Sequence, residues 1–245
     1  MINMNNIFVI SDIHGHYEEF IQLLNFWNKE DDLVLLGDLI DRGPNSLRVI
    51  EKVMALKEIY GENVTFIKGN HEDMLLNYLQ NPNEKREHYY KNGGKETMAN
   101  FLASLSPSEI ISNEYGVNEV LSHYHHELQF LLKAQLYKRI GDVLLTHAGF
   151  NSQSSTLEDT TERDFLWIRK HYLTTNQTPF INVFGHTPTK FIHDSNDIWV
   201  SEDKRYIAID GGCYMSGQLN AVKLNVSGDI IETYKVNSQK SVMNT

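Results

Sequence analysis

The sequence has little of what disulfide-linked, membrane-bound or nucleic-acid-binding proteins contain. Cys213 is its only cysteine, so no disulfide can form within the chain, and this favours a reducing compartment. The first apolar run, Ile7 to Ile10, is far shorter than the ~20 residues of a membrane span or the ~7 to 15 of a secretory signal. We therefore expect a soluble cytoplasmic protein with no membrane contact.

Positive charge is also scarce. The chain has 22 lysine and arginine residues against 32 aspartate and glutamate residues, a formal net charge of -10. The basic residues are scattered, whereas binding to a nucleic-acid backbone depends on clustered cations. No nucleic-acid partner is predicted. With 245 residues, 41% of them hydrophobic, the chain can bury a large core, and we expect residues 1–245 to form a single domain.

The N-terminal part of the chain alternates strand-like and helix-like segments. Helices are expected from about Tyr17 and from about Ser46, because apolar residues recur after these points at steps of three and four. The Ser46 hydroxyl is expected to cap the second helix. Short apolar runs that read as strands occupy 7–10, 33–36 and 64–67. This order predicts a βαβαβ start and hence an α/β fold.

The remainder divides into a helical part and a strand-rich part. Between Glu72 and about Leu132 the pattern is helical and polar, with helices near 73–79, 95–105 and 118–132. We interpret residues 81–134 as a helical, lid-like insertion that faces the substrate. Strands are then expected at 143–145, 181–184, 206–209, 221–224 and 230–234, the last three as an antiparallel meander.

Three short polar motifs follow the three N-terminal strands. They are Asp12-Ile13-His14, the string Gly37 to Gly43 (GDLIDRG) and the string Gly69 to Glu72 (GNHE). A chance match to the second pattern has a probability of about 10⁻⁴ in a chain of this length, and to the third about 10⁻³. Because the carboxyl ends of parallel strands meet at one edge of a sheet, the three motifs are expected to form one cluster.

Two further histidines, His147 and His186, each come directly after a later strand-like run. With Asp12, His14, Asp38 and Asn70 they supply two carboxylates, one amide oxygen and three imidazoles, and no thiolate. Such a mixed oxygen and nitrogen set suits a pair of Mn, Fe or Zn ions better than calcium or a structural zinc.

With these motifs the chain resembles the calcineurin-like metallophosphoesterases, in particular the phosphoprotein phosphatase branch and its small bacterial and bacteriophage lambda type serine/threonine protein phosphatases. The resemblance covers about residues 7–225 and implies a central mixed β-sandwich flanked by helices, with antiparallel C-terminal strands. It also implies two divalent metal ions, most simply manganese. Asp12 and His14 would hold the first ion, Asp38 would bridge both, and Asn70, His147 and His186 would complete the second.

The same residues suggest a mechanism. A bridging carboxylate offsets the repulsion between two dications ~3.5 to 4 Å apart, and the hydroxide that such a pair makes available attacks phosphorus in line. His71 is the expected general acid, with Asp41 orienting its ring and raising its pKa. Arg42 is expected to grip phosphate oxygens through its planar fork. By resemblance, Arg169 is a second phosphate-binding arginine, with Asn70 at the same phosphate, and Asn92-Gly93-Gly94 forms a turn at the rim of the site.

The function expected from this resemblance is hydrolysis of phosphoserine and phosphothreonine, with phosphotyrosine as a further substrate. The partner is then a phosphorylated protein or peptide, with small phosphoesters as additional substrates. One alternative is a symmetrical dinucleoside tetraphosphate hydrolase, which Asp41 and Glu72 disfavour, because those enzymes commonly lack the first residue and have aspartate at the second. Another is an inactive, metal-binding interaction protein, which the complete ligand set disfavours. The sequence makes no prediction of the oligomeric state.

Overall fold

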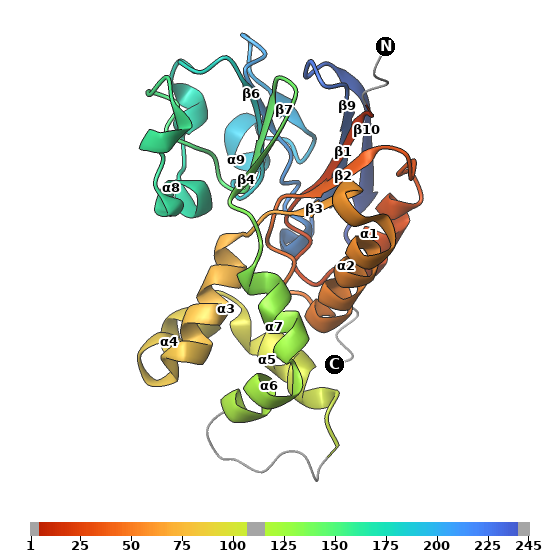
Figure 1. Ribbon diagram of the computed structural model, residues 1–245, viewed down its shortest axis with the longest axis vertical. Coiled ribbons are helices and arrows are strands. Elements are labelled where there is room, and N and C mark those ends of the chain that lie inside the picture. Colours follow the sequence, from red (N-terminus) through yellow and green to blue (C-terminus); the bar gives the residue numbers. More distant parts are fainter. Residues whose placement is uncertain (1–4, 107–115, 240–245) are drawn as a thin grey trace.

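Two five-stranded sheets form the centre of the molecule (Figure 1). The computed structural model describes residues 5–106 and 116–239. The first sheet has the order β10-β9-β1-β2-β3 and the second the order β4-β5-β6-β8-β7. Their strands are β1 (Ile7–Ile10), β2 (Asp32–Leu35), β3 (Val64–Phe66), β4 (Tyr137–Ile140), β5 (Val143–Thr146), β6 (Ile181–Phe184), β7 (Trp199–Val200), β8 (Tyr206–Ala208), β9 (Gln218–Leu224) and β10 (Ile230–Asn237).

The sheets pack face to face, and the alternation of side chains along β1 shows how. Ile7 and Val9 point into an apolar core shared with Val143 and Val183 of the second sheet. The alternate residues of β1 point into a second core, under the helices. Because both faces of the central strands are covered, their sequences are continuous apolar runs. The expected β-sandwich flanked by helices is therefore confirmed.

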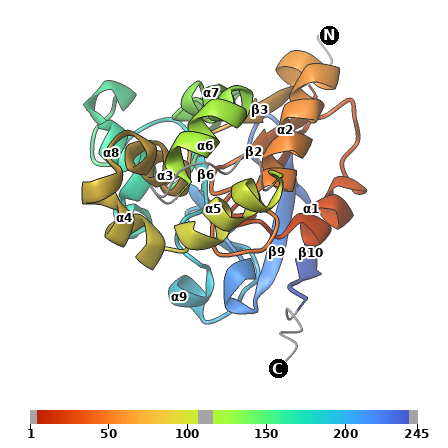
Figure 2. The ribbon, with the colours of Figure 1, turned by 90° about the horizontal axis from the view of Figure 1, so that it is seen from below.

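The helices lie outside and below the sandwich. In the first sheet, α1 packs against β9 and β10 and α2 against β3. Helices α3 to α7 gather below the strands, and Figure 2 shows them across that end of the molecule. None of the helices in the two described ranges is both long and apolar enough to cross a membrane. The helices are α1 (Tyr17–Leu24), α2 (Ser46–Tyr60), α3 (Asn70–Gln80), α4 (Pro82–Lys91), α5 (Gly94–Ala103), α6 (Val117–His123), α7 (His125–Leu132), α8 (Glu162–Trp167) and α9 (Lys190–His193), with 3₁₀ turns η1 (Gly61–Asn63), η2 (Leu157–Asp159), η3 (His171–Leu173) and η4 (Cys213–Met215).

The βαβαβ start is confirmed, with β1, β2 and β3 paired in parallel. The predicted C-terminal meander is wrong in one strand. Of the three strands expected in the meander, β9 and β10 pair antiparallel with each other, whereas β8 joins the other sheet, parallel to β6. The physical reason is the connection: the segment between β8 and β9 includes η4 and crosses from one sheet to the other instead of turning back as a hairpin.

Two details of the helical part also differ from prediction. The helix expected at 118–132 is interrupted at Tyr124, which separates α6 from α7. Ser46 is the first residue of α2 rather than its cap, and its hydroxyl accepts from the backbone N–H of Asp41 at 3.1 Å. The proposed insertion at 81–134 contains α4 to α7, and its residues 107–115 lie outside the described residues.

A buried histidine in the second sheet makes stability depend on pH. His171 is 4% exposed, its Nε2 donates to Oδ1 of Asn182 at 3.0 Å, and burial lowers its pKa to about 4. In the unfolded chain the pKa is about 6.5, so between these values the unfolded state binds the extra proton and stability falls as pH falls.

We expect His171→Gln to remove this loss. The shift corresponds to about 3 kcal/mol of unfolding free energy between pH 7 and pH 4. Urea denaturation at both pH values, for the parent and the variant, measures it. A variant that loses as much stability on acidification as the parent would contradict the assignment.

Candidate active site

Loops that follow the parallel strands bring the predicted ligands to one place. The loop after β1 carries Asp12 and His14, and the loop after β2 carries Asp38. The N-terminus of α3 follows β3, and the loops after β5 and β6 complete the set. These last three segments supply Asn70, His147 and His186. None of the six residues is more than 6% exposed.

The backbone at these loops is strained. Asp12, His14, Asp38 and His186 all have positive φ, between 46° and 62°. This is the left-handed region, which costs non-glycine residues energy and is common at functional sites. Close contact between the loops holds these residues in place. The N–H of His14 donates to the carbonyl of Asp38 at 2.8 Å, and a Cβ on Gly185 would overlap the side chains of Ser11 and Asp12.

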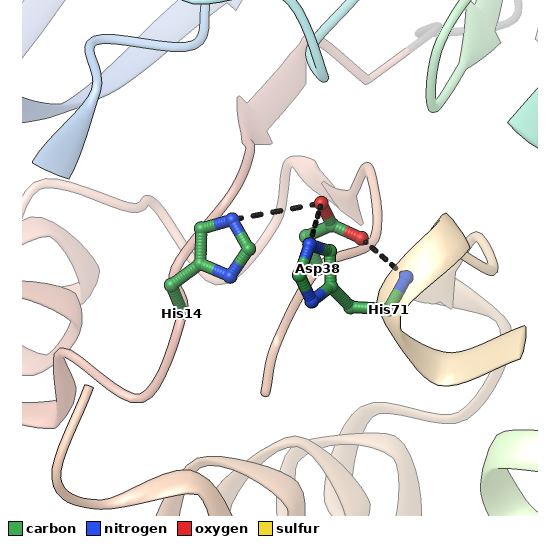
Figure 3. A group of neighbouring side chains, drawn as sticks. All are labelled: His14, Asp38 and His71. Carbon is green, nitrogen blue, oxygen red and sulfur yellow. Dashed lines mark hydrogen bonds and ion pairs between the residues drawn. The ribbon is translucent and has the colours of Figure 1, made fainter. Parts of the chain in front are cut away.

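Two of the possible metal-ligand groups among the described residues contain Asp38, and the first is His14, Asp38 and His71, whose side chains converge in Figure 3. Nε2 of His14 lies 3.6 Å and Nε2 of His71 3.9 Å from the same carboxylate oxygen of Asp38. The other ring nitrogen of His14 donates to the carbonyl of Ile40 at 2.8 Å, which fixes the ring and leaves Nε2 unprotonated in the neutral form.

The second group shares Asp38 and adds His147 and His186. Nδ1 of His147 donates to the carbonyl of Leu36 at 2.7 Å, so its Nε2 carries a free lone pair. That atom lies 2.9 Å from Oδ1 of Asn70 and 3.5 Å from Oδ1 of Asp38. Nε2 of His186 is buried and has no hydrogen-bond partner within the described ranges.

Asp12 lies outside both groups of described residues, although it belongs to the same cluster. Its carboxylate accepts from the hydroxyl of Ser11 and from the backbone N–H of His186, the latter at 3.0 Å. Burial, followed by the nearby charge of Asp210, raises the pKa of Asp12 well above its usual value. Asp210 is itself buried, and burial raises its pKa to about 6.

The electrostatics of the cluster fit bound cations. Burial, and next the charge of Asp12, raises the pKa of Asp38. Burial lowers the pKa of His147 to about 3, and that of His186 well below its usual value, so both rings are neutral. Buried acceptors thus face one another without enough donors, and a dication would satisfy them. The unpartnered Nε2 of His186 is the clearest sign of this fit.

His71 and Asp41 form the expected pair beside the cluster. Nδ1 of His71 lies 2.7 Å from Oδ2 of Asp41, and Oδ1 of Asp41 accepts from the hydroxyls of Tyr89 at 2.8 Å and Thr97 at 2.6 Å. The predicted rise in the pKa of His71 is wrong: burial lowers its pKa, and the hydrogen bond and charge of Asp41 only oppose that fall.

Two arginines border the cluster. Arg42 places one guanidinium nitrogen 2.9 Å from Nε2 of His14 and stacks its guanidinium over the ring of Tyr214, with 3.8 Å between Cζ and the ring centroid. Its backbone N–H donates to the carbonyl of Gly93, so the predicted rim turn does contact the site. Arg169 donates to the backbone carbonyl of His186 at 3.2 Å. Both predicted phosphate-binding arginines therefore adjoin the ligands.

Sequence reasoning missed the residues that support the site. Glu72 is fully buried, and its carboxylate accepts three backbone N–H groups, those of Asp38, Leu39 and Gly69, at 2.7 to 3.0 Å. Burial nevertheless raises the pKa of Glu72 to about 7. A glutamate three residues after the residue that precedes a helix, here Gly69 before α3, is a capping signal that could have revealed this role. Tyr89, Thr97 and Tyr214 have no such local signal, because they contact the site from distant parts of the chain.

The chain belongs to the calcineurin-like phosphoesterase family, whose sequence model matches residues 6–230. It is similar to the asymmetrical bis(5'-nucleosyl)-tetraphosphatase PrpE of Bacillus velezensis, with 28% identity over 242 residues, 88% of this chain and 87% of that protein. It also matches a symmetrical bis(5'-nucleosyl)-tetraphosphatase of Buchnera aphidicola at 29% identity over 153 residues, 60% of this chain and 45% of that protein. A crystal structure of a candidate diadenosine tetraphosphatase has the same fold, with a TM-score of 0.63, 20% identity and coverage of 98% and 96%.

These similarities overturn the predicted serine/threonine protein phosphatase function and the phosphoprotein partner that followed from it. Four bacterial relatives that match along 87% to 89% of their length are named asymmetrical bis(5'-nucleosyl)-tetraphosphatases. Asp41 and Glu72 were expected to disfavour a symmetrical tetraphosphatase, and the relatives similar over 88% of the chain are named asymmetrical. In the structure Asp41 holds the ring of His71 and Glu72 holds a backbone loop, so neither side chain is placed to select the group attached to the phosphate.

Proposed function

We propose that this protein hydrolyses dinucleoside tetraphosphates, such as diadenosine tetraphosphate, into a nucleoside monophosphate and a nucleoside triphosphate. The observation that carries the proposal is the similarity to asymmetrical tetraphosphatases over 88% of the chain, combined with a site that contains every ligand type of a two-metal phosphoesterase. The Buchnera relative, named symmetrical, supports the same substrate but matches less of its own length.

The metal ligands assigned from the sequence are retained in this proposal. Asp12 and His14 would hold one ion, Asp38 both, and Asn70, His147 and His186 the other. Manganese is the proposed metal, since the donors are carboxylate, amide oxygen and imidazole. When bound, the pair activates water near neutral pH and neutralises phosphate charge.

The chain's own side chains then bind phosphate and move a proton. Arg42 and Arg169, with Asn70, bind phosphate oxygens beside the cluster. The oxygen of water forms a bond to phosphorus and loses a proton to solvent, while the bond from phosphorus to the bridging oxygen breaks. Nε2 of His71 donates a proton to that departing oxygen, and Asp41 holds the ring through Nδ1 at 2.7 Å.

We further propose that residues 81–134 form a lid-like insertion on one domain that comprises residues 1–245. Tyr89 of α4 and Thr97 of α5 come from this insertion and hold Asp41 in place. Movement of α4 and α5 would therefore alter the position of His71. This arrangement links a substrate-facing segment to the proton donor.

A comparison of the rates for alternative substrates, each assayed by itself, tests the proposed function. Manganese-loaded protein is offered diadenosine tetraphosphate and, separately, phosphoserine, phosphothreonine and phosphotyrosine peptides. We expect kcat/KM for the dinucleotide to exceed that for each peptide by about 10²-fold or more, because discrimination follows transition-state binding. Faster turnover of a peptide, or no turnover of any phosphate, would overturn the proposal.

A further inference from the structure

A cavity of about 560 Å³ adjoins the phosphate-binding side of the site. The beginning of α1, the loop from Arg42 to Asn45 and the turn at Tyr214 line it, together with Ser238 and Gln239 at the end of the described residues. We infer that this cavity binds one nucleoside, the base and its ribose, of the nucleotide substrate. The inference rests on the proposed function and adds to it the place where the substrate is recognised.

Arg42 connects the cavity with the metal ligands. Its guanidinium lies 2.9 Å from Nε2 of His14 on one side and stacks over Tyr214, which lines the cavity, on the other. The width of a single side chain therefore separates the two sites. A phosphate bound between Arg42 and the cluster would have its directly attached nucleoside at the cavity. This short separation agrees with release of a nucleoside monophosphate.

The cavity has the size and aromatic lining that a nucleoside requires. Its volume falls within the range of ~300 to 1,000 Å³ typical of small-molecule sites. Tyr17 and Tyr214 both line it, and each carries an arginine over one ring face, Arg48 in the first case and Arg42 in the second. Aromatic rings and guanidinium planes are the usual stacking partners of bases.

The polar groups of the lining suit the hydroxyls of a nucleoside. Glu18 and Glu19 both line the cavity; a carboxylate oxygen of Glu18 pairs with Arg48 at 3.2 Å, and one of Glu19 lies 3.9 Å from Nδ1 of His16, which also lines the cavity. Carboxylates accept hydrogen bonds from ribose hydroxyls, as they do in dinucleotide-binding proteins. Asn45 also lines the cavity, and its side chain makes no capping bond to α2 in the described structure, which leaves its amide for a base edge.

Substitution of Tyr17 tests the inference. The measured quantity is the ratio of kcat/KM for diadenosine tetraphosphate to kcat/KM for p-nitrophenyl phosphate, which has no nucleoside. Tyr17→Ala is expected to lower this ratio by about 10-fold, through a higher KM for the dinucleotide, whereas Tyr17→Phe, which keeps the ring, should retain it. Tyr60→Ala is the matched control, because Tyr60 is also a partly buried tyrosine against the same core but does not line the cavity.

A second variant covers the case in which Tyr17→Ala does not fold. Asn45→Trp places a large side chain into the cavity from its rim and is expected to lower the same ratio by about 10-fold or more. If the parent protein cleaves the dinucleotide and neither variant changes the ratio, the cavity does not bind the nucleoside and the inference fails alone. If the parent cleaves only p-nitrophenyl phosphate, the proposed function fails and the inference falls with it.

Discussion

Replacement of Asp38 by asparagine is expected to lower kcat for diadenosine tetraphosphate by about 10³-fold or more and to reduce metal binding below two ions per chain. Among the described residues Asp38 belongs to two ligand groups. One group adds His14 and His71, and the other adds His147 and His186. An amide has nearly the same shape but lacks the negative charge that offsets repulsion between two dications. Metal content by mass spectrometry and steady-state kinetics measure the two effects.

A matched variant separates this effect from the general loss of a buried carboxylate. Asp31 is also buried, at 4% exposure, and its carboxylate pairs with Lys223 at 2.6 Å. Asp31 lies just before β2 begins, whereas Asp38 follows the end of that strand. Asp31→Asn should retain both metal ions whatever it costs in stability. If Asp38→Asn keeps two ions and the activity of the parent, the bridging assignment is wrong.

We expect His71→Asn to lower kcat for the dinucleotide by about 10²-fold while both metal ions remain bound. The reason is loss of the proton donor whose ring Asp41 holds at 2.7 Å. The loss should be larger for an alkyl phosphate than for the dinucleotide, because an alkoxide is a poorer leaving group than a phosphate oxygen and depends more on protonation.

The matched control is His14→Asn. Nε2 of His71 and Nε2 of His14 lie at similar distances, 3.9 and 3.6 Å, from one oxygen of Asp38, so the structure by itself permits either ring to be a ligand. We expect His14→Asn to lose metal and His71→Asn to retain it. Equal loss of metal in both variants would make His71 a ligand and not the general acid.

The clustering of the site could be predicted from the sequence because it depends on local features. Each ligand follows an apolar strand, and strands that run in parallel end at the same edge of a sheet. The positions of Asp12, Asp38 and Asn70 beside one another follow from the order β1-β2-β3. His147 and His186 are assigned as ligands through the family resemblance, and in the structure they follow β5 and β6, which are parallel neighbours in the second sheet.

What could not be predicted depends on long-range contact. Whether β8 pairs with β9 or with β6 is decided by the path of a loop, and alternating apolar residues are compatible with both. Tyr89 and Thr97 reach Asp41 from a separate helical segment, and no local pattern indicates this. The pKa of His71 was misjudged for a similar reason, because the depth of burial outweighs the neighbouring carboxylate.

The substrate was the largest error, and its cause is general. The motifs describe how metals and phosphate are held, which is shared by phosphatases of proteins and of nucleotides. The group attached to the phosphate is expected to contact other surfaces, such as the cavity beside Arg42 and Tyr214. None of the motifs lies on the α1 side of that cavity, so the motifs alone favoured the wrong substrate.

Product analysis tests the central claim most directly. Manganese-loaded protein is incubated with diadenosine tetraphosphate, and the nucleotides formed in the first few per cent of turnover are separated by anion-exchange chromatography. The proposed function predicts equal amounts of adenosine monophosphate and adenosine triphosphate, with both reduced about 10²-fold in His71→Asn at matched times. Adenosine diphosphate as the sole product would contradict the asymmetrical cleavage, and an unchanged dinucleotide would contradict the proposed function itself.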